Sequence, residues 1–236
     1  MKVQAVTAWV SMPVPFRHQS LEQYKQWGAG LSAALPGKIT IFDPYPFEDC
    51  WVYQWLKTKP LDWVLTLTPM TAGPADRFIH PHHMLICNIV QHERTTWACK
   101  AAWEHPAADV IVYLDYGVLK QGDFTGKRVQ EYHIGNFVRK IETQRTMDDI
   151  PFPGCWAKGT PCDTDANWRF VGSTHIWPRK YLDAIDKAYK EETIKFIERT
   201  RTIPLDLPIW AAVEQRGDLP FRQYVANHDA TQFTNY

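Results

Sequence analysis

Apolar and polar residues alternate along this chain in a way that predicts strands and helices in turn. Residues 3–10 are rich in strand-forming residues and predict a first strand. A helix is expected next, because apolar residues recur at helical spacing: Leu21, Tyr24, Trp27, Leu31 and Leu35. Ser20 and Gln23 form a capping box at its start, and residues 38–42 predict a second strand. This order predicts two parallel strands joined by a right-handed crossover.

The rest of the chain continues the alternation. The expected elements are a third strand over residues 62–68, a helix from Pro81 to about Trp103, a strand over 110–114, a helix capped by Thr125, a loop over 145–166, a strand over 168–177, and helices from Pro178 and over 208–215. Strands that alternate with helices predict an α/β fold with a mainly parallel central sheet flanked by helices. We expect one domain over residues 1–236.

Composition narrows the classes of function. Lys and Arg total 26, as do Asp and Glu, so the formal net charge is zero, which argues against a mainly electrostatic grip on nucleic acid or on an anionic membrane. No apolar run approaches the roughly 18 residues of a membrane span, and the N-terminus does not resemble a signal peptide. The five cysteines are odd in number and lack CxxC spacing. We therefore expect a reduced, cytoplasmic chain.

One strand end carries the chief candidate for chemistry. Residues 110–114 read as a strand that is apolar on both faces, and it ends in Asp115 with Gly117 two positions later. In open α/β sheets, ligands bind at the carboxyl ends of the strands. Gly117 would let the backbone turn sharply beside a ligand. An aspartate after a strand is also an ordinary turn former, so both interpretations stay open here.

Three common nucleotide or hydrolase motifs are absent from the chain. No GxGxxG opens the first helix, which disfavours a Rossmann dinucleotide site. No GxxxxGK[ST] is present, so a P-loop is excluded, and the lack of GxSxG disfavours an α/β-hydrolase.

The order of motifs resembles a known family. The segments Ile41-Phe-Asp43, Tyr113-Leu-Asp-Tyr-Gly117 and Phe170-Val-Gly-Ser-Thr-His-Ile-Trp-Pro178 follow one another as in GT-A-type nucleotide-sugar glycosyltransferases. The chain looks most like HtrL/YibB-like proteins, with Tyr113 where their Trp-x-Asp-x-Gly pattern has Trp. The resemblance implies a single GT-A-like domain, with residues 1–120 binding the nucleotide sugar and residues 121–236 forming the acceptor side. It implies sugar transfer from a donor such as a UDP-sugar to a glycan or small molecule.

The same resemblance implies roles for individual residues. Asp115 matches the first aspartate of the Asp-x-Asp motif that holds Mn²⁺ or Mg²⁺ in GT-A enzymes, and His228 matches a C-terminal metal ligand. Because Gly117 stands at the second position, Asp115 binds either the metal with other help or the donor's ribose or sugar. Further implied groups are Thr7, Ala8, Trp9 and Asp43 at the nucleotide base, Gly172 and Ser173 on the acceptor side, and Asp206 or Glu214 as an acidic general base.

Each of these assignments has a structural alternative. Trp9 alternatively belongs to the core, Gly172 to a strand bulge, Asp206 to a helix cap and His228 to a surface loop. Lys or Arg can neutralise a leaving diphosphate without metal. The candidates for that role are Arg77, Lys127, Arg128 and Lys158. A non-catalytic nucleotide-sugar-binding protein of the same fold is the alternative to an enzyme.

Two rival constellations point to other functions. The cluster His80, His82 and His83, with His92 on the same predicted helix, has the imidazoles of a zinc enzyme but not HExxH spacing, and Cys155 and Cys162 are loosely spaced. A basic run with interleaved aromatic residues would suit DNA: Lys127, Arg128, Tyr132, Phe137, Arg139, Lys140 and Arg145. DNA with a flipped hydroxymethylated base is therefore a second acceptor class.

Overall fold

The computed structural model describes residues 1–11, 21–71, 81–121, 126–156 and 169–236. Several residues singled out above lie outside these ranges, so their predictions are not addressed by the structure: Ser20, Arg77, His80, Thr125, Lys158 and Cys162. The side chain of His82 is likewise not described.

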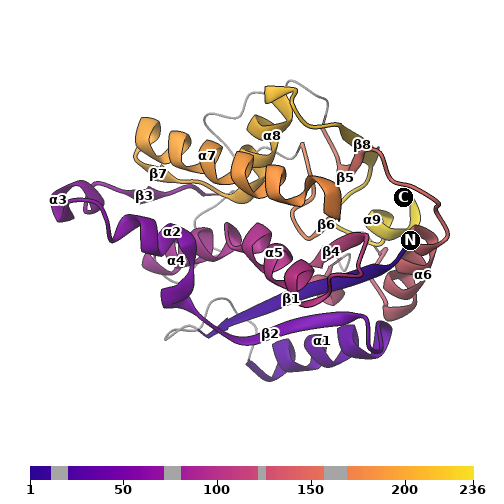
Figure 1. Ribbon diagram of the computed structural model, residues 1–236. Coiled ribbons are helices and arrows are strands. Elements are labelled where there is room, and N and C mark those ends of the chain that lie inside the picture. Colours follow the sequence, from indigo (N-terminus) through magenta and orange to yellow (C-terminus); the bar gives the residue numbers. More distant parts are fainter. Residues whose placement is uncertain (12–20, 72–80, 122–125, 157–168) are drawn as a thin grey trace.

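A four-stranded sheet organises the chain (Figure 1). Its order is β2 (Ile39–Pro46), β1 (Val3–Ser11), β4 (Val110–Leu114) and β6 (Thr174–Pro178). β1 runs parallel to both β2 and β4, whereas β6 is antiparallel to β4. The predicted α/β class with a mainly parallel sheet is therefore confirmed, as is the parallel pairing of the first two strands.

Helices cover both faces of the sheet because β4 is apolar on both sides. Ile111 and Tyr113 face the core under α5 (Arg94–Glu104), α7 (Leu182–Thr200) and α8 (Asp206–Arg216). Val110, Val112 and Leu114 face the opposite core, which α1 (Leu21–Ala34) and α6 (Glu131–Glu142) complete. In Figure 1, α1 lies below the sheet and α7 and α8 lie above it. Every residue of β4 is buried, as its sequence predicts.

Smaller elements extend this frame. Two parallel two-stranded pairs join β3 (Thr68–Pro69) to β7 (Thr202–Ile203) and β5 (Ile150–Gly154) to β8 (Phe221–Val225). The remaining α-helices are α2 (Trp51–Leu56), α3 (Leu61–Val64), α4 (Pro81–Gln91) and α9 (Thr231–Thr234), and a 3-10 turn η3 covers Val118–Lys120. Within the described ranges, no helix combines the length and apolarity needed to cross a bilayer.

The third strand expected over residues 62–68 is wrong. The chain instead makes the helical turn α3, in which the Val64 N–H donates to the Pro60 carbonyl at 3.0 Å. Only residues 68 and 69 are extended. Leu61 and Leu65 stay exposed, so the alternation here does not mark a buried strand face.

The long helix expected from Pro81 to about Trp103 is divided into α4 and α5. Glu93, at the break, is buried, and its carboxylate accepts hydrogen bonds from the Tyr45 hydroxyl (3.0 Å) and the Trp51 N–H (2.8 Å). These contacts hold Glu93 between the two helices, and the guanidinium of the next residue, Arg94, lies 3.7 Å from Asp115 at the end of β4.

Three other boundaries differ from the sequence prediction. The loop expected over residues 145–166 contains the strand β5. Its prolines, Pro151 and Pro153, are tolerated because β5 pairs only with β8 among the described strands, and a strand with one partner leaves every second N–H without a ladder hydrogen bond. The strand expected over 168–177 begins only at Thr174. The helix expected after Thr125 begins at Glu131, behind a capping box made by Gln130 and His133.

Candidate functional site

Asp115 lies at the carboxyl end of β4, with its side chain 34% exposed. Its N–H donates to the Ser173 carbonyl at 2.8 Å, which ties the strand end to β6. Its Oδ1 accepts the Gly117 N–H at 2.8 Å, and the chain then turns into η3. One carboxylate oxygen therefore closes a turn while the group still reaches the rim of the sheet. The turn-former interpretation is therefore confirmed at this residue, and the ligand site stays a prediction.

Arg94 is the chief residue that sequence reasoning missed. Its guanidinium is buried and forks between two carboxylates: Nη2 lies 3.7 Å from Asp115 Oδ2, and Nη1 is paired with Asp206. The guanidinium also lies over the Tyr113 ring, 5.2 Å from its centroid. A planar fork suits two acceptors at once. Arg94 therefore fixes the position of Asp115 from the core side of the sheet.

Asp206 is enclosed by this ion pair rather than open to a substrate. Its side chain is 4% exposed, and burial raises its pKa while Arg94 acts in the opposite direction. A Cβ on Gly172 would lie 2.9 Å from Asp206 Oδ2 and 3.1 Å from Arg94 Nη1, so glycine is needed for the backbone to pass this pair. In this arrangement the Asp206 carboxylate holds Arg94. Its role as a general base stays a prediction.

Glu214 is engaged in a second buried ion pair. Its carboxylate accepts two hydrogen bonds from Arg169, at 2.9 and 2.7 Å, and both side chains are at most 5% exposed. Arg169 also donates to the Trp156 carbonyl at 2.7 Å. The pair therefore braces α8 against the chain beside β5, and a general-base role for Glu214 stays a prediction.

His228 shares the electrostatic environment of Asp115. Burial lowers the pKa of His228 to about 4, with a further lowering by the Arg94 charge and opposite contributions from Asp229 and Asp115. The metal-ligand role that the resemblance implies for His228 stays a prediction. At neutral pH the imidazole is uncharged.

The residues around Asp115 do not make a good site for a divalent cation. Gly117 offers no second carboxylate, and no set of three His, Cys, Asp or Glu side chains suited to a metal occurs in the described ranges. The Arg94 guanidinium already lies beside Asp115 Oδ2. Hard cations take several oxygen ligands and are repelled by neighbouring positive charge. The metal stays a prediction that this donor set does not favour.

An aromatic pocket with one acidic and one basic residue lies beside this site. Its cavity of about 180 Å³ is lined by Trp9, Tyr24, Lys25, Asp43, Pro44 and Tyr116. The Trp9 ring packs against Tyr24 and Tyr116 at centroid distances of 4.5 and 5.6 Å. The Tyr116 hydroxyl donates to Asp43 Oδ2 at 3.2 Å. Because Tyr116 follows Asp115 in the chain, the pocket and the strand-end carboxylate are immediate neighbours.

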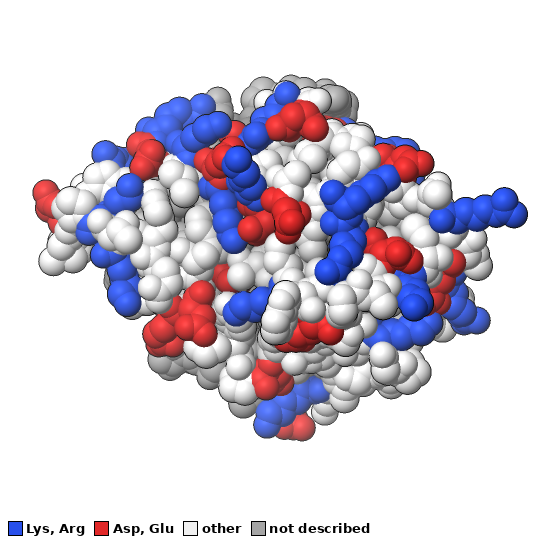
Figure 2. All heavy atoms as spheres, in the orientation of Figure 1, with Lys and Arg blue, Asp and Glu red and all other residues white. Residues whose placement is uncertain are grey.

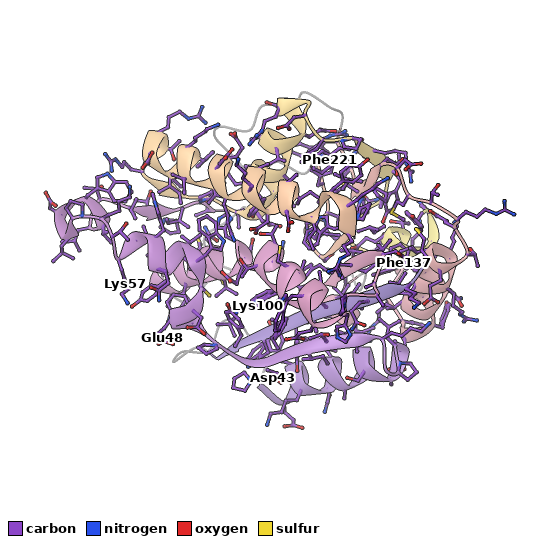
Figure 3. The ribbon with its side chains drawn as sticks, in the orientation of Figure 1. Asp43, Glu48, Lys57, Lys100, Phe137 and Phe221 are labelled. Atoms are coloured by element: carbon purple, nitrogen blue, oxygen red, sulfur yellow. The ribbon has the colours of Figure 1, made fainter. Side chains whose placement is uncertain are left out.

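The pocket keeps Tyr116 protonated. Burial and the Asp43 carboxylate raise the pKa of Tyr116 to about 12, so its hydroxyl remains a donor at neutral pH. Figure 3 labels Asp43 on β2, where the strand passes beside β1. The predicted grouping of Trp9 and Asp43 is thus realised in space.

Thr7, Ala8 and Ser173, which were also predicted to belong to the site, do not line the pocket. Thr7 and Ala8 are buried within β1, so of the three β1 residues only Trp9 lines the pocket. The buried Ser173 hydroxyl donates within a network of amide side chains, to Gln232 Oε1 (2.6 Å) or Gln121 Oε1 (3.0 Å). This network connects η3, β6 and the C-terminal α9, and thereby holds the segment that carries His228 near the end of β4.

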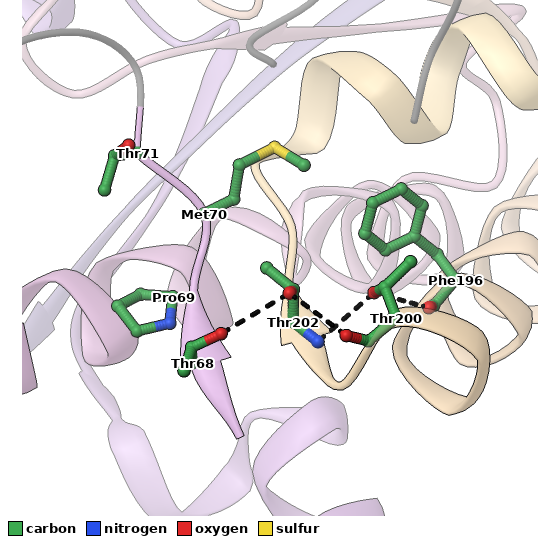
Figure 4. Close-up of a pocket in the computed structure, with 7 residues that line it drawn as sticks. All are labelled: Thr68, Pro69, Met70, Thr71, Phe196, Thr200 and Thr202. Atoms are coloured by element: carbon green, nitrogen blue, oxygen red, sulfur yellow. Dashed lines mark hydrogen bonds between the residues drawn. The ribbon is translucent and has the colours of Figure 1, made fainter. Parts of the chain in front are cut away.

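A second cavity, of about 230 Å³, has a different character (Figure 4). It lies between β3, β7 and the end of α7, and its lining consists of Thr68, Pro69, Met70, Thr71, Phe196, Thr200 and Thr202. None of these side chains is charged, and none belongs to the site around Asp115. It therefore offers no positive charge to a diphosphate.

His92 is not available to the zinc site considered above. His92 is buried, its Nδ1 lies 2.8 Å from the Tyr189 hydroxyl, and its Nε2 lies 3.0 Å from the Pro204 carbonyl. Because Nε2 must donate to that carbonyl, Nδ1 accepts from Tyr189, and neither nitrogen is available to a metal. Cys155 donates to the Ala226 carbonyl at 3.0 Å.

Only part of the basic and aromatic run lies on α6, because Lys127 and Arg128 precede this helix and Arg145 follows it. Phe137, which Figure 3 labels, is buried in the core, so only Tyr132 of the two aromatic residues is exposed. Arg139 donates to Asn136 at 2.6 Å, and Lys140 to the Tyr236 carbonyl. On the face shown in Figure 2, acidic and basic side chains are interspersed. DNA as an acceptor stays a prediction.

Comparisons with known proteins give a structural likeness only. No family model matches the chain, and no curated protein matches it significantly. Its structure is similar to that of a glycosyltransferase involved in the glycosylation of the major capsid of PBCV-1. The TM-score is 0.50 and the sequences are 9% identical, over 96% of this chain and 83% of that one. The likeness shows a shared fold, which agrees with the α/β architecture described above.

Proposed function

We propose that this chain is a GT-A-type glycosyltransferase that moves a sugar from a nucleotide-sugar donor to an acceptor. The observation that carries the proposal is the juxtaposition of Asp115, partly exposed at the end of a central parallel strand, with an aromatic pocket that begins at the next residue, Tyr116. In open α/β sheets, this edge is where nucleotides bind. The shared fold with a known glycosyltransferase supports the same proposal.

The pocket suits the nucleotide base. Its volume of about 180 Å³ is below the roughly 300–1,000 Å³ typical of sites for whole drug-sized ligands, so we assign it only one end of the donor. Trp9, Tyr24 and Tyr116 provide rings against which a base can stack. The Asp43 carboxylate can accept a hydrogen bond from a base N–H or a ribose hydroxyl.

The position of the base determines where the diphosphate and the sugar of the donor lie. With the base in the pocket, the diphosphate and the sugar extend past Tyr116 toward Asp115, Arg94 and His228. Asp115 is then placed to accept a hydrogen bond from a hydroxyl of the ribose or the sugar. The acceptor, a glycan or a small molecule, would approach from the side formed by residues 121–236.

A donor screen tests the proposal. Isothermal titration of the purified chain with UDP-, GDP-, ADP- and CDP-sugars, followed by an assay of sugar release, should find one nucleotide class that binds and is turned over. Binding with neither hydrolysis nor transfer to any acceptor would support the non-catalytic binding protein instead. Binding of no nucleotide sugar would remove the proposal.

A further inference from the structure

The position that a second motif carboxylate would occupy holds a lysine side chain instead. A Cβ built on Gly117 would lie 3.3 Å from Lys120 Nζ, 3.3 Å from Lys120 Cε and 3.4 Å from Asp115 Oδ1. The ammonium and the carboxylate oxygen therefore both border the space left by the missing side chain. The turn η3 brings Lys120 back over Gly117, only three residues further along the chain.

Lys120 also borders the nucleotide pocket. Its Nζ lies 5.5 Å from the centroids of the Tyr24 and Trp27 rings, and Tyr24 is one of the pocket-lining residues. The ammonium is thus placed between the proposed base pocket on one side and Asp115 on the other. A donor that spans these two places would pass its diphosphate along this side chain.

We infer that Lys120 binds the diphosphate of the donor and replaces a divalent metal in this enzyme. The inference rests on the function proposed above. Lys120 supplies a positive charge at the missing second carboxylate, and Arg94, held by Asp206, keeps Asp115 in place as the acceptor of a donor hydroxyl. A compact ammonium is a common phosphate ligand.

The reaction that this site would assist is a simple displacement. The bond between the sugar C1 and the diphosphate oxygen breaks, and its electron pair stays on the diphosphate. The acceptor hydroxyl oxygen forms a new bond to C1, and its proton passes to a base or to water. Lys120 donates hydrogen bonds to the diphosphate oxygens while their negative charge grows, and it does not itself give up a proton.

Binding measurements on the full chain test the inference. The probes are UDP, GDP, ADP and CDP, their nucleosides, and inorganic pyrophosphate, each titrated in excess EDTA and again with Mn²⁺. The variants are Lys120→Met, which keeps an apolar stem of similar length, Lys120→Arg as the conservative change, and Lys57→Met as an exposed control on the segment after α2. Thermal unfolding of each variant shows whether it is folded.

We expect one nucleoside diphosphate to bind equally well in EDTA and in Mn²⁺. Lys120→Met should raise its Kd about ten- to hundredfold, the range for losing a hydrogen bond to a charged group, and leave nucleoside binding unchanged. Lys120→Arg should recover most of the affinity, and Lys57→Met should match the wild type. In Gly117→Asp/Lys120→Ala, which restores the Asp-x-Asp pattern, binding should become dependent on Mn²⁺.

Each other outcome overturns a different claim. A nucleoside diphosphate that binds wild type only with Mn²⁺, or that binds Lys120→Met as tightly as wild type, would overturn the role of Lys120 while the glycosyltransferase proposal stands. Pyrophosphate binding that depends on Lys120, without binding of any nucleotide, would keep the anion site and remove the nucleotide-sugar proposal. Binding of none of the probes would overturn both.

Discussion

Arg94 Nη2 lies 3.7 Å from Asp115 Oδ2, while Nη1 of the same guanidinium is paired with the buried Asp206. One arginine thus connects the break between α4 and α5, the end of β4 and the start of α8. Because the Arg94 and Asp206 side chains are at most 7% exposed, their charges depend on each other inside the protein. The position of Asp115 therefore depends on an ion pair that is buried in the core.

Arg94→Met should destabilise the fold strongly, since it leaves the Asp206 carboxylate buried without its partner. Breaking a buried pair in this way costs about 3–5 kcal/mol in the free energy of unfolding. Arg94→Met/Asp206→Leu, which removes both charges, should cost less than the single change. Urea unfolding of the three proteins measures this difference, and a single variant as stable as wild type would mean that the ion pair is unimportant.

Trp9→Ala should weaken nucleotide binding without abolishing it. Stacking of a base on an aromatic ring contributes about 1–3 kcal/mol, so the Kd should rise about five- to hundredfold. Trp103→Ala is the matched control, because Trp103 is 83% exposed on α5 and does not line the pocket. Titration calorimetry compares the two variants. Equal affinities in both would place the base outside this pocket.

The fold should lose stability in mild acid through its buried histidines. Burial lowers the pKa of His92 to about 3 from its ordinary 6.5, and burial also lowers the pKa of His175. Between pH 6.5 and about 3, the unfolded chain therefore binds a proton at His92 that the folded chain does not. The contribution of each such histidine to the free energy of unfolding should fall as the pH falls through this window, by up to about 1.4 kcal/mol per pH unit.

His92→Gln isolates that contribution. The variant should be less stable than wild type at pH 7.5, but its stability should fall less between pH 7.5 and 5. Chemical unfolding at several pH values provides the comparison. Parallel curves for His92→Gln and wild type would show that His92 does not carry the effect.

The central sheet was predictable because its signals are local. The runs of strand-forming residues that became β1, β2 and β4 are short. Turn-forming residues lie next to them, such as Pro36-Gly37 before β2 and Asp115 after β4. The same local approach failed at residues 62–68, where the apolar residues Leu61 and Leu65 are exposed and a helical turn forms instead. Alternation alone does not show which side chains another element will cover.

The sequence predicted that Asp115 ends a central strand and that Trp9 lies near Asp43, but it did not predict the cations around them. Arg94 falls inside what reads as one continuous helix, and only the buried contacts of Glu93 divide that helix. The polar run His92-Glu-Arg-Thr95, within an otherwise apolar helical pattern, was the available signal. Lys120 reaches Gly117 through a turn that has no distinctive sequence pattern.

The account depends most directly on the carboxylate at the end of β4. Asp115→Asn keeps the Oδ1 acceptor for the Gly117 N–H, so the variant should stay folded, with only a small loss of thermal stability from the weakened contact to Arg94. The exposed control Asp183→Asn should unfold at the wild-type temperature. The decisive measurement is the rate of sugar release from the bound nucleotide sugar. We expect Asp115→Asn to lower this rate about 100-fold or more and Asp183→Asn to leave it unchanged. A folded Asp115→Asn protein with the wild-type rate would contradict the account.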